Sequence, residues 1–165
     1  MVVVGIDPGT ATTGYGFVRE GEAGLVAVAY GVISTPAGTP MPLRLQTIYR
    51  ELSRLVRLHQ PVSAAVEQLF FSKNVTTALA VGQARGVVLL ALAECGLEVA
   101  EYKPMEIKQA VSGYGGAGKR QVQEMVRMQL GLDEVPRPDD AADALAIAIC
   151  HVSRQHFQTL LDQSS

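Results

Sequence analysis

The stretch GIDPGTATTGYG, Gly5–Gly16, joins two expected strands through a turn and places a carboxylate at the end of the first. The apolar run Met1–Val4 comes before it, which predicts a buried strand that ends at Asp7. Proline and glycine directly after Asp7 predict a tight turn, and TGYGFVRE beyond it predicts a second strand. Because a charge at the end of a buried strand is costly without compensation, Asp7 is either a turn former or part of a site.

The remaining sequence predicts an α/β domain with a mixed five-stranded sheet and helices on both faces. A third strand, LVAVAYGVI, follows a short connection, so the first three strands should pair antiparallel. A helix opened by Pro42, a fourth strand SAAVEQLFF and an apolar helix over 75–95 lead to a fifth strand, LEVAEYK. This strand, helix and strand unit completes the sheet. Further helices are expected over Pro104–Ala110, 119–131 and 136–155.

Length and composition indicate the domain organisation and the compartment. A chain of 165 residues fits one domain, which we expect over residues 1–157, with a polar tail over 158–165 that need not be ordered. The N-terminus has no basic region followed by an apolar leader. Glycine, glutamine and arginine interrupt the longest apolar stretch, 78–95, which disfavours a membrane span. We therefore expect a cytoplasmic protein with no membrane partner.

Four carboxylates lie where the predicted fold can bring them together: Asp7, Glu67, Asp140 and Asp143. Asp140 and Asp143 share one face of the last helix, but Asp139 would share a face with Asp143 equally well, and periodicity does not choose. Packed carboxylates repel one another unless a cation neutralises them, and a hard divalent ion such as magnesium suits oxygen ligands. Two such ions would activate a water and stabilise the leaving oxygen in phosphodiester hydrolysis.

Each of these acids also has an ordinary structural explanation. An aspartate before Pro-Gly commonly forms a turn, a strand glutamate often faces solvent, and acids at a helix start favour its dipole. The structural explanation is weakest for Glu67, because its neighbours in AAVEQLFF are mostly apolar. A charge in such surroundings costs several kcal/mol unless it is compensated.

The charge distribution permits a nucleic-acid partner without demanding one. The net charge is −2, whereas affinity for phosphate comes largely from lysine and arginine. Leaving out the four nominated acids changes −2 to +2, and residues 103–128 carry five basic side chains against two acidic ones. Such a region is commonly a solvated surface.

Six segments, spread in order over nearly the whole chain, resemble the RuvC family of bacterial Holliday junction resolvases: GIDPGTATTGYG, AVEQLFFSKN, VGQARGV, IKQAVSGYG, GKRQVQ and DAADALAIAICH. The resemblance implies a ribonuclease H-like fold, a homodimer, and magnesium as the cofactor, expected as two ions per site with Mn²⁺ able to substitute. It implies symmetric cuts in a four-way DNA junction during recombination and repair, leaving 5′-phosphate and 3′-hydroxyl ends. RuvA and RuvB, the branch-migration motor, are the implied partners.

The resemblance also assigns roles to residues. The motif D-A-A-D-A-L maps the helical acids onto Asp140 and Asp143, which makes Asp139 a helix-start acid. The two functional lysines of the family fall on Lys108 and Lys119, in the basic region around the glycine loop. They would offset charge on a phosphate, and the alternative for both is a solvated helix face.

Three further residues are candidates for DNA binding. Phe70 matches the family aromatic that stacks on a base, but alternation does not tell whether Phe70 or Phe71 points outward. Aromatic residues at a strand end are more often part of the core. Arg120 follows Lys119 in the basic region and is the third candidate.

The helix over 75–95 gives an independent indication of a dimer. It is apolar nearly all round, so it needs cover on more than one side. The sheet would cover one side and a second copy another, and a two-fold dimer presents two identical sites for paired nicks. A helix buried within one subunit is the alternative.

Three rival functions fit the sequence less well. GYGGAGKR nearly matches a nucleotide phosphate loop, but Arg120 stands where that motif has serine or threonine. The opening D-x-G-T resembles the phosphate loop of actin-like sugar kinases, which need two lobes. A ribonuclease H-like family that processes ribosomal RNA precursors shares the G-I-D-P-G-T type of turn but lacks EQLFF, GQARG and DAADALA. In that turn, Gly9 is expected to leave room for a DNA backbone, and Thr10–Thr13 either contact phosphate or shape the hairpin.

Overall fold

A five-stranded sheet organises residues 1–68 and 75–163, the part of the chain that the computed structural model describes. Its strand order is β3-β2-β1-β4-β5, with β2 antiparallel to β1 and β3, and β4 parallel to β1 and β5. The predicted mixed sheet is therefore confirmed. The elements are β1 (Val2–Asp7), β2 (Thr12–Gly21), β3 (Gly24–Ser34), α1 (Met41–His59), β4 (Ser63–Glu67), α2 (Val75–Glu94), β5 (Val99–Tyr102), α3 (Pro104–Ser112), α4 (Lys119–Gln129) and α5 (Asp139–Gln163).

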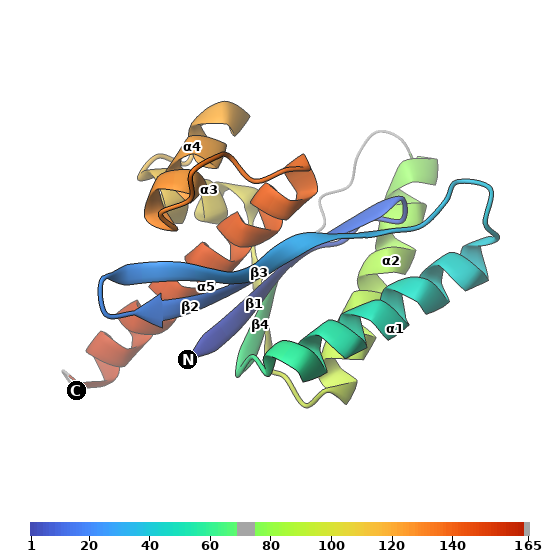
Figure 1. Ribbon diagram of the computed structural model, residues 1–165, viewed down its shortest axis with the longest axis horizontal. Helices are drawn as coiled ribbons and strands as arrows, with labels where there is room; N and C mark the ends of the chain where they lie inside the picture. Colours follow the sequence, from blue (N-terminus) through green and yellow to red (C-terminus); the bar gives the residue numbers. More distant parts are fainter. Residues whose placement is uncertain (69–74, 164–165) are drawn as a thin grey trace.

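Helices cover both faces of the sheet, as predicted. Figure 1 shows α5 crossing one face, with α3 and α4 beside it, while α1 and α2 lie against the other face. Successive residues of β1 serve the two layers, because strand side chains alternate between faces. Val3 belongs to the core cluster that contains Ile149 of α5. Val4 belongs to the cluster that contains Leu52 of α1 and Leu92 of α2.

Two glycines allow α5 to pass very close to the sheet. A Cβ atom on Gly5 would lie 2.2 Å from the carbonyl oxygen of Ala144, and one on Gly14 would lie 2.0 Å from the carbonyl oxygen of Asp140. Any larger residue would push the helix away from β1 and β2. Because Gly14 pairs with Asp7 in the sheet, the same close approach brings the start of α5 to the end of β1.

Helix boundaries differ from the prediction at both ends of α5. The helix begins at Asp139 rather than at residue 136, because a proline disfavours helical geometry in the residue before it and Pro138 stands there. It continues to Gln163, so residues 158–163 of the expected polar tail are helical. No proline or glycine follows Pro138 in this stretch of sequence, and Gln158 donates a hydrogen bond of 2.9 Å to Asp162 one turn on.

The apolar character of α2 persists in three dimensions. Within the described ranges it is the one helix whose length and composition would allow it to cross a membrane. Only 22% of the apolar segment of α2 is buried within the chain, and the side chains of Val75, Leu79 and Leu90 are exposed. One side packs on α1 and β5, which leaves another side without cover from the described part of this subunit.

Candidate active site

The four nominated acids converge at one end of the sheet from three directions. Asp7 ends β1 and Glu67 ends β4, and these parallel neighbours present both side chains at the same edge. The N-terminal end of α5 reaches that edge and carries Asp140 in its first turn and Asp143 one turn further on. The charges of Glu67, Asp140 and Asp143 all act on Asp7, so these four acids lie within electrostatic range of one another although they are far apart in sequence.

Burial and mutual repulsion make this cluster costly to ionise. Burial first, and then the charges of Asp143, Asp140 and Glu67, raise the pKa of Asp7 from 3.8 to about 7. Burial also raises the pKa of Glu67 and of Asp143. Lysines oppose the shift, Lys108 at Glu67 and Lys119 at Asp143. The site therefore holds more negative charge than its surroundings stabilise at neutral pH.

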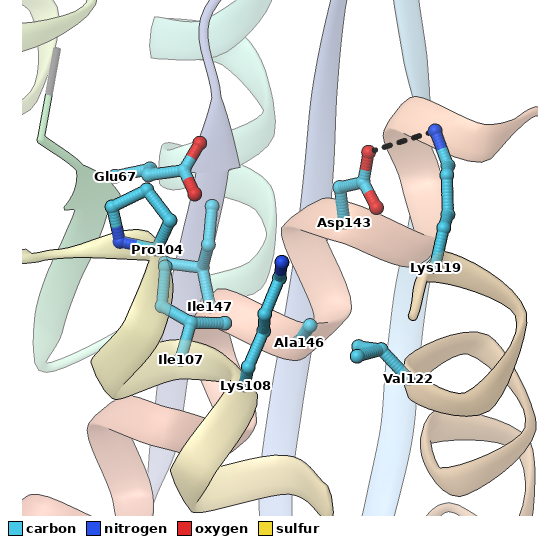
Figure 2. Close-up of a pocket in the computed structure, with 9 residues that line it drawn as sticks. All are labelled: Glu67, Pro104, Ile107, Lys108, Lys119, Val122, Asp143, Ala146 and Ile147. Atoms are coloured by element: carbon cyan, nitrogen blue, oxygen red, sulfur yellow. Dashed lines mark ion pairs between the residues drawn. The ribbon is translucent and has the colours of Figure 1, made fainter. Parts of the chain in front are cut away.

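A cavity of about 240 Å³ opens beside the acids (Figure 2). Glu67 and Asp143 lie on its two sides, and the ammonium groups of Lys108 and Lys119 line it as well. Its remaining wall is largely apolar and comes from α3, α4 and α5: Pro104, Ile107, Val122, Ala146 and Ile147. The cavity thus combines carboxylates, cations and an apolar wall.

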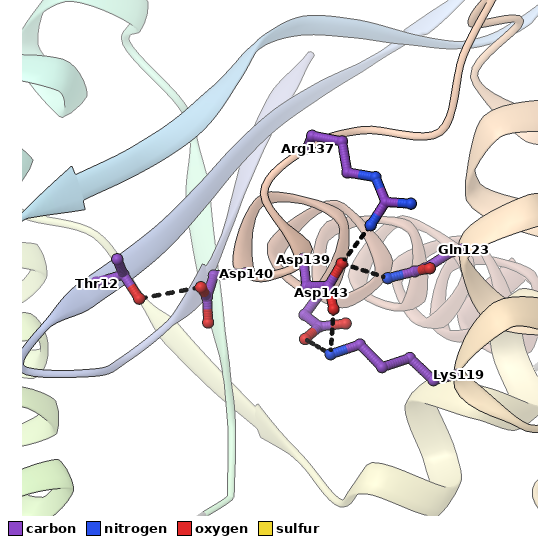
Figure 3. A network of polar contacts seen from close by, with 7 residues as sticks. All are labelled: Thr12, Lys119, Gln123, Arg137, Asp139, Asp140 and Asp143. Carbon is purple, nitrogen blue, oxygen red and sulfur yellow. Dashed lines mark hydrogen bonds and ion pairs between the residues drawn. The ribbon is translucent and has the colours of Figure 1, made fainter.

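Lys119 is held by two aspartates at the start of α5 (Figure 3). Its Nζ lies 3.1 Å from Oδ2 of Asp139 and 3.6 Å from Oδ2 of Asp143. The other oxygen of Asp139 accepts hydrogen bonds from Gln123 Nε2 at 3.1 Å and from Arg137 Nη1 at 2.9 Å. Asp139 is therefore more than a helix-start acid, because it fixes Lys119 beside the cluster. The sequence offered no signal for this pairing beyond the nearness of three acids.

The threonines of the first turn shape the site from within. Thr12 Oγ1 donates a hydrogen bond of 3.0 Å to Oδ2 of Asp140, and Thr13 Oγ1 donates one of 2.7 Å to the carbonyl of Gly9. Thr35 Oγ1 also donates to the carbonyl of Thr10. A Cβ atom on Gly9 would lie 2.4 Å from the carbonyl oxygen of Thr12, so the turn itself requires a glycine there. Thr12 therefore orients Asp140, while the hydrogen bonds of Thr13 and Thr35 stabilise the turn between β1 and β2.

Of the residues nominated for DNA binding, only some line the cavity. Lys108 on α3 and Lys119 on α4 both reach the cavity, although they belong to different helices. Arg120 is exposed and does not line it. Phe70 and Phe71 lie outside the described residues, so their nomination stays a prediction.

The donor set fits a hard divalent ion. Four carboxylates supply oxygen ligands, and a cation would relieve the repulsion that raises the pKa of Asp7. Among residues 1–68 and 75–163, no three acidic, histidine or cysteine side chains already form a metal-holding group. In this structure the ammonium of Lys119 supplies part of the compensation, because it pairs with Asp143.

Comparisons with known proteins agree on one family. A family model described as "Crossover junction endodeoxyribonuclease RuvC" matches residues 3–151. Curated proteins of that name from Chloroflexus aggregans and Desulfitobacterium hafniense are 63% and 58% identical to this chain. The first match covers 92% of each chain, and the second covers 99% of this chain and 97% of the relative.

Solved structures support the same fold. The structure of T. thermophilus RuvC in complex with Holliday junction substrate matches with a TM-score of 0.91 at 40% identity, covering 96% of this chain and 97% of that one. The yeast mitochondrial Holliday junction resolvase Ydc2 matches with a TM-score of 0.66 at 15% identity, covering 99% of this chain and 86% of that one, which indicates a shared fold alone.

Proposed function

The chain belongs to the RuvC family of crossover junction endodeoxyribonucleases, and from this premise we propose that it cuts four-way DNA junctions at a divalent metal site formed by Asp7, Glu67, Asp140 and Asp143. The observation that carries the proposal is the convergence of these acids at one edge of the sheet, beside a cavity with two lysines. Strand ends fix two of the ligands and a helix turn fixes the other two. Symmetric cuts in two strands of the four-way junction would resolve it into two duplexes.

Magnesium is the expected cofactor, because it prefers carboxylate oxygens and phosphate. Two ions match four carboxylates, and Mn²⁺ should substitute because it favours the same ligands. When bound, the metal would supply stabilisation of charge at the scissile phosphate and a water of lowered pKa. The residues of the chain supply the rest: Thr12 holds Asp140, and the strand ends hold Asp7 and Glu67.

The lysines act on the DNA. Lys108 and Lys119 project from separate helices into the cavity, where their ammonium groups can bind the oxygens of the scissile phosphate. Lys119 lines the cavity and also contacts the acid cluster, since its Nζ lies 3.6 Å from Oδ2 of Asp143. Attack of a water molecule forms a new bond to phosphorus, the bond from phosphorus to the 3′-oxygen breaks, and that oxygen takes up a proton, which gives the expected 5′-phosphate and 3′-hydroxyl ends.

We also propose a homodimer formed through α2. Exposed apolar residues on this helix, Val75, Leu79 and Leu90, need cover that the described part of the chain does not provide. A second copy provides it by two-fold symmetry and places two sites on a substrate that has the same symmetry. RuvA and RuvB are the expected partners, and the cytoplasm, which holds the bacterial chromosome, is the expected compartment.

The test is cleavage of a synthetic four-way junction with Mg²⁺, next to a linear duplex of the same sequence. We expect paired nicks in the junction alone, and loss of cleavage in Asp7→Asn with junction binding retained. An Asp133→Asn variant, altered on an exposed loop, serves as the matched control. Equal cutting of junction and duplex, or full activity in Asp7→Asn, would sink the proposal.

A further inference from the structure

The motif VGQARGV has no place in the site described so far. It lies on α2, and its arginine, Arg85, is the one basic residue in the sequence of that helix. Although α2 has a largely exposed surface, the Arg85 side chain is only 16% exposed. A covered charge on an otherwise apolar helix is costly unless it is paired, so the partners of Arg85 indicate its role.

Arg85 contacts both strands next to the acid cluster. Its Nη2 lies 2.7 Å from Oε2 of Glu101 on β5. Its Nε donates a longer hydrogen bond, 3.5 Å, to the main-chain carbonyl of Glu67 on β4. One guanidinium thus joins α2 to two neighbouring strands, a task for which its several fixed N–H donors are suited.

These contacts lie at the end of the sheet where the pairing of β4 with β5 stops. Glu67 is the last residue of β4 and pairs with Tyr102, the last residue of β5. One hydrogen bond beyond this pair, 2.8 Å from the amide of Gln68 to the carbonyl of Tyr102, continues the contact between the two strands. Among the strands of the described residues, β5 lies at the edge of the sheet and pairs with β4 alone.

We propose that Arg85 is a positioning residue for Glu67. By binding the Glu67 carbonyl and Glu101 together, it sets the point from which the Glu67 side chain enters the acid cluster. The same contacts tie α2, the proposed dimer helix, to the end of the sheet that carries the ligands. The inference rests on the proposed function in one respect, because Glu67 is a metal ligand only there.

The test uses Arg85→Gln and Glu101→Gln in the full chain, singly and together. Arg154→Gln is the matched control, since it breaks a more exposed pair, Arg154–Glu106 at 3.1 Å, with the same chemical change. Four measurements are compared: single-turnover junction cleavage against Mg²⁺ concentration, junction affinity in EDTA, Mn²⁺ affinity by calorimetry, and hydrogen exchange of the peptide that covers residues 63–68.

In Arg85→Gln we expect cleavage to fall about 10- to 100-fold, as is typical when a residue that orients a metal ligand is lost. The Mg²⁺ concentration for half-maximal cleavage should rise, Mn²⁺ affinity should fall, and exchange over residues 63–68 should accelerate. Junction affinity should stay within twofold of wild type, and the molar mass in solution should stay that of the wild-type dimer. Glu101→Gln should give a smaller loss, and the double variant should match Arg85→Gln rather than add to it, because the two side chains act as one unit.

Two results would overturn the inference. In the first, Arg85→Gln keeps the Mn²⁺ affinity and exchange of the control. In the second, its losses accompany unfolding or dimer dissociation, which would indicate a merely structural role. Both are read without cleavage, so they remain decisive even if the wild type fails to cut junctions, a result that would instead refute the proposed function.

Discussion

Replacing Asp7 by asparagine should stabilise the metal-free protein at neutral and basic pH while abolishing cleavage. Asp7 is the most strongly perturbed acid of the cluster, because burial and three other carboxylates act on it together. Asparagine nearly keeps the shape of the side chain, replaces one acceptor oxygen with an NH₂ donor, and cannot ionise. The ionised Asp7 carboxylate therefore destabilises the metal-free wild type, and the same carboxylate is the one that we expect to bind a cation.

The magnitude follows from the pKa of Asp7, raised from 3.8 to about 7. Between these pH values the folded protein keeps a proton that the unfolded chain has released, so the free energy of unfolding decreases as the pH rises. Linkage gives a decrease of roughly 2 to 3 kcal/mol between pH 5 and pH 8 from this one group. Asp7→Asn escapes this decrease, so its advantage over wild type should grow by that amount over the same interval.

The assay is urea unfolding in EDTA at pH 5 and pH 8, with both proteins measured at both pH values. Asp133→Asn, on an exposed loop, controls for the loss of one negative charge. Addition of Mg²⁺ at pH 8 should stabilise the wild type more than Asp7→Asn. A stability difference between the two proteins that does not change with pH, or a less stable Asp7→Asn at pH 8, would refute the reasoning.

Three further predictions test the packing, the cations and the dimer. Gly14→Ala should lower the free energy of unfolding, measured with urea, by about 3 kcal/mol or more, because the added Cβ atom would lie 2.0 Å from the carbonyl oxygen of Asp140. Gly38→Ala is the control and should leave the free energy of unfolding unchanged, because a Cβ atom there would have no neighbouring atom within 4 Å. Lys119→Gln should slow single-turnover cleavage about 100-fold through lost stabilisation of phosphate charge, while Arg120→Gln, outside the cavity, should mainly weaken junction binding; equal effects on rate would contradict this division. Leu79→Glu on α2 should dissociate the dimer in light scattering, whereas Leu58→Glu on α1, equally exposed, should not.

Much of the fold could be predicted because it rests on local patterns. Apolar alternation and turn residues located the five strands in their correct order, and short connections indicated the antiparallel pairs. The tail was predicted less well, because it was read as polar although Phe157, Leu160 and Leu161 recur at helical spacing; it is helical to Gln163 with these three side chains exposed.

Within the site, the sequence located the acids but not their supports. Periodicity left Asp139 and Asp140 equivalent, and the structure separates them: Thr12 holds Asp140, while Asp139 pairs with Lys119. Pairings of this kind join residues that are 128 and 20 positions apart, and no local pattern encodes them. The glycines of β1 and β2 looked like turn or strand residues, although their function is to let α5 approach the sheet.

The most direct test of the account locates the metal itself. Crystals grown with Mn²⁺ should show anomalous scattering peaks bounded by carboxylate oxygens of Asp7, Glu67, Asp140 and Asp143, with Asp139 outside the ligand set. Asp7→Asn crystals prepared in the same way should lose at least one peak. Peaks elsewhere on the molecule, or a peak at the sheet edge whose ligands exclude Asp7 and Glu67, would contradict the assignment of these four acids as one metal site.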